Sequence, residues 1–290
     1  MVNVRTAQLT QADGARLSLT TKPPLDDESR WFVADVAGWY GGSGVRGDSV
    51  ARLGHGNFVS RGYREGRTLT LHGWVDCANT DIRDWQERNL SGLMWDGKWG
   101  DLTCYDGNVE LSTRVRLDGS PQIVKTGVTN LTFQIPLVAE SPFLLGENRE
   151  LTLFPPGTGT GFEIPPFASV RSPSGEPVIS FGTEVRRDTM IWNDGNAESF
   201  PVFTVVADSP AGFSVSIGGR RVTYPWPTYK NVPIEVDMAG AIRVAGQDQT
   251  YRVGERGWAS VEPQSIETPE FRFLAGGTGW ATVAFRDTYI

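Results

Sequence analysis

The chain has 290 residues, enough for one large or two ordinary domains. With 39% apolar and 21% charged residues, its composition is that of a folded protein rather than a disordered one. The formal net charge of −7 argues against a general nucleic-acid binder, which needs clustered Lys and Arg, and against adhesion to an anionic membrane. The counts of Gly (34), Pro (18) and Trp (10) are high, which favours many short strands joined by turns.

The sequence gives no sign of a secretory signal or a membrane span. The first ten residues, MVNVRTAQLT, lack the apolar core of a signal peptide. No apolar run approaches the roughly 18 residues that a membrane helix needs. We therefore expect synthesis in the cytoplasm, with Cys77 and Cys104 as free thiols.

The first part of the chain is predicted to form strands and loops. Residues 16–21 (RLSLTT) alternate apolar and polar side chains, as a half-buried strand does, and residues 30–39 form a second run. Residues 38–48 (GWYGGSGVRGD) contain too many glycines for regular structure, which predicts a long flexible loop or a hairpin tip. Residues 67–76 (RTLTLHGWVD) alternate again and predict another strand.

The hydrophobic period changes over residues 79–97, which predicts one amphipathic helix near 80–95. Asn79 or Thr80 is a suitable N-cap, and Gly97 is a suitable end. The apolar side chains that share one helical face are Ile82, Trp85, Leu90, Leu93 and Met94.

Strands resume after the helix. Two Asp-Gly dipeptides, at 106–107 and 118–119, mark turns between strand-like runs. Residues 130–142 alternate and predict the strand that closes a first domain. We expect a joint near residue 145, between a first domain over 1–145 and a second over 146–290.

The second domain is predicted to contain only strands. Its short apolar runs are evenly spaced and are separated by Gly, Pro, Asn and Asp, a pattern typical of an antiparallel sandwich. The predicted fold class is therefore mainly β. A β-barrel or β-sandwich domain with one α-helix is followed by an antiparallel β-sandwich domain.

Residues 192–208 (WNDGNAESFPVFTVVAD) allow two interpretations. Asn193, Asp194 and Asn196 offer oxygen ligands for a cation, or they form the tight turn that precedes a strand. A Ca²⁺ loop needs acidic residues at several alternate positions, whereas Asp194 is the single acid of this turn. Pro201 suits the first residue of a strand, where its missing N–H does least harm. The turn is favoured, and no metal site is predicted.

No motif in the chain predicts catalysis or a cofactor. The chain contains two histidines, His55 and His72, and no G-x-S-x-G elbow. The four Cys and His residues are not at metal-ligand spacing. Residues 157–162 (GTGTGF) lack the Lys-Ser/Thr of a phosphate loop and predict a flexible loop. We expect no enzyme activity, no cofactor and no metal.

A proline-stiffened segment, residues 224–229 (YPWPTY), carries three aromatic side chains. Exposed, Tyr224, Trp226 and Tyr229 would stack on a sugar or on a protein partner; buried, they would belong to the core. The two prolines favour a surface loop.

The succession of these elements resembles the distal tail proteins of phages with long non-contractile tails. The passages that carry the resemblance are GRTLTLHGWVD with DIRDWQERNLSGLM (66–76 and 81–94), NLTFQIPLVAESPFLLG (130–146), NDGNAESFPVFTV (193–205) and FRFLAGGTGWATVAFRDTYI (271–290). They resemble, in turn, the family's strand followed by a helix, the strand that leads out of its first domain, its turn into a proline-started strand and its last hairpin.

The resemblance implies a tail-tube-like first domain and a galectin-like second domain. It implies a ring, of six copies in the family, that joins the tail tube protein to the tail-tip hub and lines the channel through which DNA leaves without specific binding. The chain would be a virion component made in the host cytoplasm, without an enzymatic site. Some members carry sugar-binding inserts in the second domain, so a host-surface glycan is a further candidate partner.

A closed ring needs heterologous contacts, in which one surface meets a different surface of the next copy. The Gly-rich segment 38–57 is predicted to be such a docking loop, ordered only in the assembly. We expect deletion of 40–48 to leave a soluble fold that does not assemble. The candidate partner contacts are Trp39, Tyr40, Gly41, Gly42, Arg46, Trp226 and Tyr229.

Two other classes of function remain open at this stage. A glycan-binding module predicts a monomer whose Trp226 or Tyr229 fluorescence responds to oligosaccharide. A carbohydrate-active enzyme needs a pair of facing carboxylates, which no motif in this sequence marks. The lack of a visible secretion signal disfavours both, since sugar polymers lie outside the cell.

Overall fold

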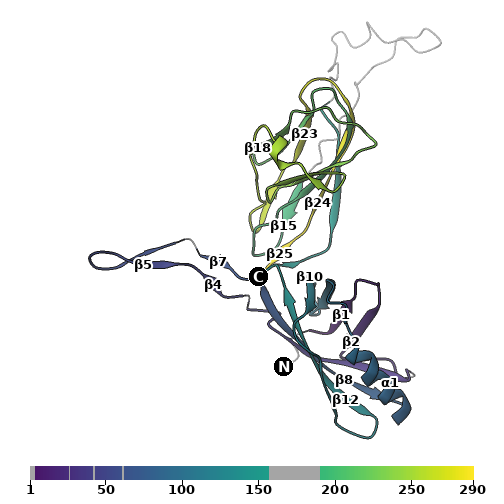
Figure 1. Ribbon diagram of the computed structural model, residues 1–290. Coiled ribbons are helices and arrows are strands. Elements are labelled where there is room, and N and C mark those ends of the chain that lie inside the picture. Colours follow the sequence, from purple (N-terminus) through teal and green to yellow (C-terminus); the bar gives the residue numbers. More distant parts are fainter. Residues whose placement is uncertain (1–3, 26, 42, 61, 157–189) are drawn as a thin grey trace, which may run out of the picture. The chain divides into compact units, whose positions relative to one another are not determined.

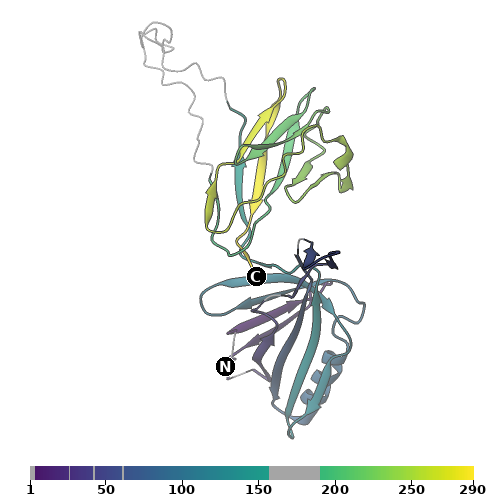
Figure 2. The same ribbon diagram turned by 90° about the vertical axis from the view of Figure 1, so that its left-hand side faces the viewer.

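The computed structural model describes residues 4–25, 27–41, 43–60, 62–156 and 190–290. The chain divides into two compact units, which Figure 1 and Figure 2 show from two sides. Unit 1 comprises Met1–Glu147 together with Thr288–Ile290, and unit 2 comprises Asn148–Asp287. Among the described residues, no helix has the length and apolar character that crossing a membrane requires. The loop predicted at 157–162 lies outside the described residues.

Unit 1 is built on a closed barrel of seven strands. The strands follow each other in the order β12, β8, β3, β2, β1, β9 and β10, and β10 pairs back onto β12 to close the barrel. All of these pairings are antiparallel except the single parallel pair between β2 and β3. The seven strands are β1 (Thr6–Thr10), β2 (Arg16–Thr20), β3 (Ser29–Ala37), β8 (Arg67–Cys77), β9 (Gly100–Tyr105), β10 (Glu110–Leu117) and β12 (Asn130–Ala139).

Three shorter strands extend the barrel sheet. On one side, β11 (Gln122–Lys125) pairs with β12. On the other, β13 (Leu144–Leu145) pairs with β10 and with β25 (Thr288–Tyr289). The last residues of the chain therefore return to unit 1 after unit 2 has formed.

The predicted alternation of β8 and β12 sets the barrel core. In β8, Leu69 and Leu71 are fully buried, while Thr68 is exposed and His72 is partly exposed. The two strands pair from Asn130↔Asp76 to Ala139↔Arg67, so their apolar faces point the same way. Because side chains in a strand alternate between the two faces, this register places one continuous apolar layer inside the barrel.

The single α-helix of the described residues, α1 (Thr80–Ser91), begins as the sequence predicts. The Oδ1 atom of Asn79 accepts the backbone N–H of Ile82 at 2.9 Å, which caps the helix. The predicted end at Gly97 is wrong: the helix ends at Ser91, where the N–H of Gly92 bonds back to the carbonyl of Arg88. The chain then turns, with Leu93 and Met94 buried in the barrel core and Trp95 exposed.

A two-stranded ribbon projects from unit 1 between β3 and β8 (Figure 1). In it β4 (Val45–Arg46) pairs with β7 (Tyr63–Arg64), and β5 (Ser49–Ala51) pairs with β6 (Asn57–Val59). We call residues 43–65 the arm. The sequence predicted a flexible loop or a hairpin tip here; the structure extends the feature to residue 65 and pairs its two sides.

Unit 2 consists of two main sheets around one core. The larger sheet runs in the order β14, β24, β16, β19, β20 and β21, and the smaller in the order β18, β17 and β23. Buried side chains of both sheets form a single apolar cluster. The strands are β14 (Arg149–Leu153), β16 (Val202–Asp208), β17 (Phe213–Ile217), β18 (Arg220–Tyr224), β19 (Ile234–Asp237), β20 (Ala241–Val244), β21 (Gln247–Asp248), β23 (Glu270–Phe273) and β24 (Thr278–Phe285).

A small third sheet of unit 2 pairs β15 (Ile191–Asn193) with β22 (Ser265–Glu267). One short 3₁₀ helix, η1 (Thr250–Arg252), corrects the expectation of strands alone. The fold class predicted from sequence is confirmed: the described chain is mainly β, with a barrel that carries one α-helix followed by an antiparallel β-sandwich.

Candidate assembly interface

The arm exposes apolar side chains that no part of its own unit covers. Val50 and Phe58 face each other across the β5–β6 pair and are 65% and 62% exposed. Leu53, at the tip, is fully exposed, and Val59 is 73% exposed. An isolated two-stranded ribbon is at best marginally stable in water, and exposed apolar patches mark interaction sites. The arm therefore has the character of a segment that docks on another surface.

The root of the arm is held by a buried arginine. Arg67, the first residue of β8, is 1% exposed, and its guanidinium donates to the carbonyl oxygens of Gly38, Trp39 and Pro142. Burial lowers the pKa of Arg67, and the neighbouring charge of Arg64 lowers it further. Gly38 and Trp39 precede the arm and Pro142 follows β12, so one side chain ties the entry of the arm to the barrel.

Close backbone packing fixes the same root. At Gly38, where φ is +79°, a Cβ atom would lie 2.3 Å from the carbonyl oxygen of Thr68. At Gly66 it would lie 2.7 Å from the carbonyl oxygen of Ala139. Only glycine fits such approaches, so these glycines hold the arm root in place while the arm itself has few contacts.

A second contact joins the start of the arm to the barrel. The hydroxyl of Tyr40 donates to Oδ2 of Asp106, in the β9–β10 turn, at 2.6 Å. Burial raises the pKa of Tyr40, and the bond to Asp106 raises it further. The same bond is the main cause that lowers the pKa of Asp106. Each partner thus stabilises the protonation state that the other prefers.

The partner contacts that the sequence predicts in unit 1 differ in how exposed they are. Trp39 is 1% exposed and belongs to the barrel core, so its ring supports the root and is not free to meet a partner. Tyr40 is 46% exposed, and Gly41 is exposed with φ of +101°. Arg46 is exposed and lies 3.4 Å from Glu65 on the opposite side of the arm. The remaining candidate, at position 42, lies outside the described residues.

Sequence reasoning missed the second half of the arm and its anchor. The stretch over 57–64 has apolar and aromatic residues but no alternation that points to a core, because the residues described in it, 57–60 and 62–64, are all exposed. The sequence predicts that Arg67 lies in a strand but gives no sign that its side chain is buried. The one available signal was its position at the junction of a Gly-rich segment and a strongly alternating strand.

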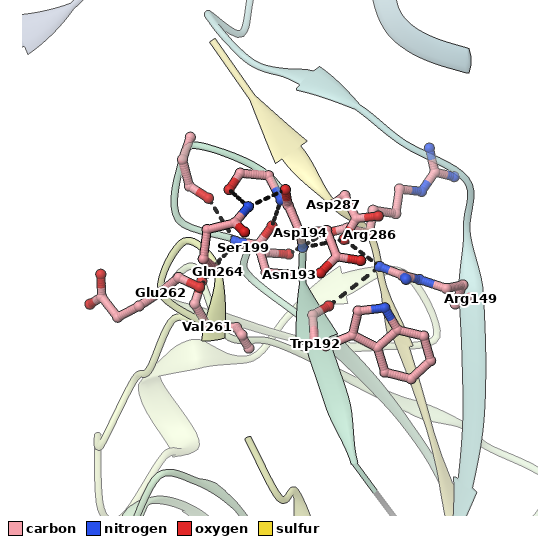
Figure 3. A network of polar contacts seen from close by, with 12 residues as sticks. Arg149, Trp192, Asn193, Asp194, Ser199, Val261, Glu262, Gln264, Arg286 and Asp287 are labelled. Carbon is pink, nitrogen blue, oxygen red and sulfur yellow. Dashed lines mark hydrogen bonds and ion pairs between the residues drawn. The ribbon is translucent and has the colours of Figure 1, made fainter. Parts of the chain in front are cut away.

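In unit 2 the turn at 193–196 is the centre of a polar network (Figure 3). Asn193 is fully buried; its Nδ2 donates to the carbonyls of Ala197 at 2.7 Å and Val261 at 3.1 Å. Its Oδ1 accepts the N–H of Gly195, which closes a side-chain turn. Among the described residues, no group of three His, Cys, Asp or Glu side chains is placed to hold a metal ion. The side chain of Asn193 thus forms the turn, which the sequence also favoured.

The network also joins the first and last strands of unit 2. Nη2 of Arg149, at the start of β14, lies 2.5 Å from Oδ1 of Asp287, which also accepts the N–H of Asp194. The guanidinium of Arg149 lies 4.5 Å from the ring of Trp192 and 4.8 Å from that of Phe285 (Figure 3 shows the Trp192 ring). These contacts tie the two chain ends of unit 2 to the 193–196 turn. We call this set the end network.

The two candidate contacts of unit 2 are exposed. Trp226 is 47% and Tyr229 is 61% exposed, whereas Tyr224 of the same segment is buried. The guanidinium of Arg252 lies 5.4 Å from the Trp226 ring, and the Trp226 Nε1–H donates to the carbonyl of Arg252. Tyr251, 70% exposed, lies 5.6 Å from the same guanidinium. Trp226, Tyr251 and Arg252 thus form an aromatic patch on the surface.

Both cysteines are buried and free. Cys104 is 1% exposed, and burial raises the pKa of its thiol. Cys77 is 7% exposed, and its pKa is also raised by burial. A buried, protonated thiol is a poor nucleophile, so neither cysteine has the character of a reactive group.

No family model matches the chain, and no curated protein matches it. Among solved structures, the chain is similar to the Dit protein of phage SPP1, described as a paradigm of the hub adsorption apparatus of phages that infect Gram-positive bacteria. The two share 13% sequence identity with a TM-score of 0.60, over 98% of this chain and 99% of that one. A baseplate chain of phage P2, in its activated conformation with calcium, aligns at 10% identity with a TM-score of 0.47, over 99% of this chain and 98% of that one. The chain therefore has the fold of the SPP1 Dit protein along nearly its whole length.

Proposed function

We propose that the chain is a structural protein of a phage tail that assembles into a ring through its arms. The observation that carries this proposal is the arm. It is a ribbon anchored at its root that exposes apolar side chains, whereas the apolar side chains of the barrel core are buried. The Dit-like fold over the full chain supports it, because the SPP1 protein is described as a hub. The ring joins the tail tube to the tail-tip apparatus and contains six copies.

The charge of the chain suits a channel for DNA. A ring of copies with a formal charge of −7 each repels phosphates and does not retain them. The same balance keeps the free protomers soluble until the arms dock. We base no part of the proposal on reactive side chains, and we assign no catalytic role to the chain.

The deletion that tests this function follows from the arm's own hydrogen bonds. The N–H of Glu65 donates to the carbonyl of Gly44 at 3.2 Å, so residues 45–64 can be replaced by Asn-Gly, which favours a tight hairpin turn. We expect this variant to fold with an unchanged circular dichroism spectrum and melting temperature and to remain monomeric. The full chain is expected to form closed oligomers under the same conditions. Equal oligomers from both proteins would contradict the proposal.

We propose no second function for the aromatic patch of unit 2. Arg252 lies over the ring of Trp226 and its carbonyl takes the indole N–H, so groups that a sugar would use are already engaged. Glycan binding predicts a change in tryptophan fluorescence on adding oligosaccharide, and a Trp226→Phe variant would lose it. We expect no such change.

A further inference from the structure

Helix α1 borders a surface groove of unit 1 that the barrel fold does not fill. Three adjoining hollows, of about 550, 390 and 400 Å³, share their lining. Trp85 and Gln86 line the first and second, Ser18 and Trp31 line the first and third, and Ser29 lines the second and third. We call this continuous surface the helix groove.

The walls of the helix groove are largely apolar. Trp85 is 54% exposed although it lies on the apolar face of α1, and Trp31 is partly buried beside it. Leu17, Leu93, Ile82 and Pro23 are among the other apolar residues that line it. Tryptophan is among the residues that most often dominate binding energy at protein interfaces, above all where a partner can exclude water from it.

The rim of the helix groove is acidic. Asp27, Glu28 and Asp81 are exposed lining residues, against the single arginine Arg16. A partner that brings apolar side chains flanked by positive charge would satisfy both the walls and the rim.

The arm has this chemistry. Residues 43–65 contain four arginines and two acids, a net charge of +2, although the whole chain carries −7. Leu53 and Phe58 are large, exposed apolar side chains of the arm, and the guanidinium of Arg52 lies 4.5 Å from the ring of Phe58. The arm therefore carries an apolar tip with a positive charge beside it.

The arm and the helix groove lie on different sides of the same unit. In Figure 1 the arm extends away from the barrel on the side opposite α1. A contact between them must then join two copies, with the arm of each copy meeting the groove of the next. Such head-to-tail contacts generate a ring when the rotation between copies closes.

We propose that the arm of one copy docks in the helix groove of the next copy, with Leu53 and Phe58 against Trp85 and Trp31. The positive charge of Arg52 then lies near the acidic rim. The inference rests on the proposed ring function and names the surface that receives the arm.

Cysteine cross-linking between two variants of the full chain tests this docking. One variant carries Leu53→Cys in the arm, and the other carries Trp85→Cys in the groove; both native cysteines are buried. A control, Thr132→Cys, places an exposed thiol on the outer face of β12. After mixing, disassembly and reassembly, mild oxidation is expected to link Leu53→Cys to Trp85→Cys, at least about tenfold faster than to Thr132→Cys, since only the first pair is held together.

The mass of each mixture before oxidation separates a failure of the docking proposal from a failure of the proposed ring function. Oligomers that form but show no preferred link between the arm and the groove would overturn the docking and leave the ring intact. A chain that stays monomeric would overturn the ring function itself. If Trp85→Cys does not fold, Asp81→Cys at the same groove is used in its place.

Charge reversal gives a second readout at the same surface. Arg52→Glu alone is expected to weaken assembly at least about tenfold, and more so at low salt, because it places a carboxylate near the acidic rim. Combined with Glu28→Lys and Asp81→Lys in the groove, it is expected to recover assembly. Equal weakening in the single and the combined variant would overturn the pairing.

Discussion

The arm root of unit 1 and the end network of unit 2 are both organised by an arginine, but the surfaces next to them differ. Arg67 is fully buried and paired with carbonyls alone, and the segment it anchors exposes apolar side chains. Arg149 is paired with the carboxylate of Asp287, and its guanidinium lies beside the rings of Trp192 and Phe285, so contacts within unit 2 hold both of its chain ends. The first arrangement leaves apolar side chains exposed on a projecting segment, and the second joins the two chain ends of unit 2 to one turn.

The difference teaches where to look for function in a fold without a catalytic site. In both regions one buried side-chain atom lacks a hydrogen-bond partner, Oγ of Ser43 at the arm and Nε of Arg149 in the end network, so unsatisfied polar groups do not distinguish them. What distinguishes them is where the exposed apolar side chains lie. Those of the arm lie on a projecting ribbon, whereas Trp192 and Ile266 beside the end network lie on two strands paired with each other within unit 2. Changes to the arm should therefore alter assembly, and changes to either anchor should alter stability.

The largest effect is expected from removing the apolar tip of the arm. The double variant Leu53→Ser/Phe58→Ser should weaken assembly by about 100-fold or more, because truncating interface anchors costs about 2 kcal/mol each. Its melting temperature as a monomer should stay within about 2 °C of the parent, since both side chains are exposed. Sedimentation velocity over a concentration series measures the first quantity. Unchanged assembly would contradict the role of the apolar tip in assembly.

The second effect concerns the root. Arg67→Met should lower the free energy of unfolding by about 3 kcal/mol, because it removes the charged donor to the carbonyls of Gly38, Trp39 and Pro142, of which the Trp39 carbonyl is buried. Arg64→Met, at an exposed arm position, is the matched control and should change it by less than about 0.5 kcal/mol. Urea unfolding measures both. A loss below about 1 kcal/mol for Arg67→Met would mean that the root is not held by this side chain.

The third effect tests the end network. Asn193→Ala should cost about 2 kcal/mol, since it removes a buried amide that satisfies two carbonyls and closes the turn. Glu198→Ala, exposed in the same segment, should be nearly neutral. Assembly of Asn193→Ala should match the parent at temperatures where it is folded. Loss of assembly in the folded variant would show that the end network does more than close unit 2.

The smallest effect is a pH-dependent one at the arm root. Asp106 has a lowered pKa because it accepts from Tyr40, so its contribution is present above about pH 4, the ordinary Asp value, and is lost as the pH falls through the lower folded pKa. Tyr40 has a raised pKa, so its contribution is present below about pH 10 and is lost as the pH rises beyond that. Tyr40→Phe should cost about 0.5 kcal/mol at pH 7, and the cost should become smaller as the pH is lowered toward 2 and Asp106 gains its proton. Thermal melts at the two pH values measure this, and a constant difference would contradict the assignment.

Sequence patterns predicted the parts of this fold that bury one face. The alternation in 67–76 and 130–142 fixed two barrel strands, and Asn79 marked the helix start, because burial and capping leave periodic or local signals. The Asn193 turn was favoured for the same reason. A Gly-rich loop was also recognised at the start of the arm.

The rest could not be predicted because it depends on what covers a side chain. Helical period placed Trp85 and Leu90 on one face, but Leu90 is buried while Trp85 is half exposed beside the groove. Trp39 lies in the core although it is surrounded in sequence by glycines. The return strand of the arm has two exposed faces and hence no period, and Arg67 is buried only because three distant carbonyls meet at the root.

The central claim, assembly through the arm, is tested most directly by the mass of the purified full chain in solution, measured over a range of concentrations beside the variant with residues 45–64 replaced by Asn-Gly. Self-association of the full chain into one closed species of six copies, with the variant monomeric at every concentration, is the result that the account predicts. A full chain that stays monomeric throughout, or a variant that assembles equally well, would contradict it.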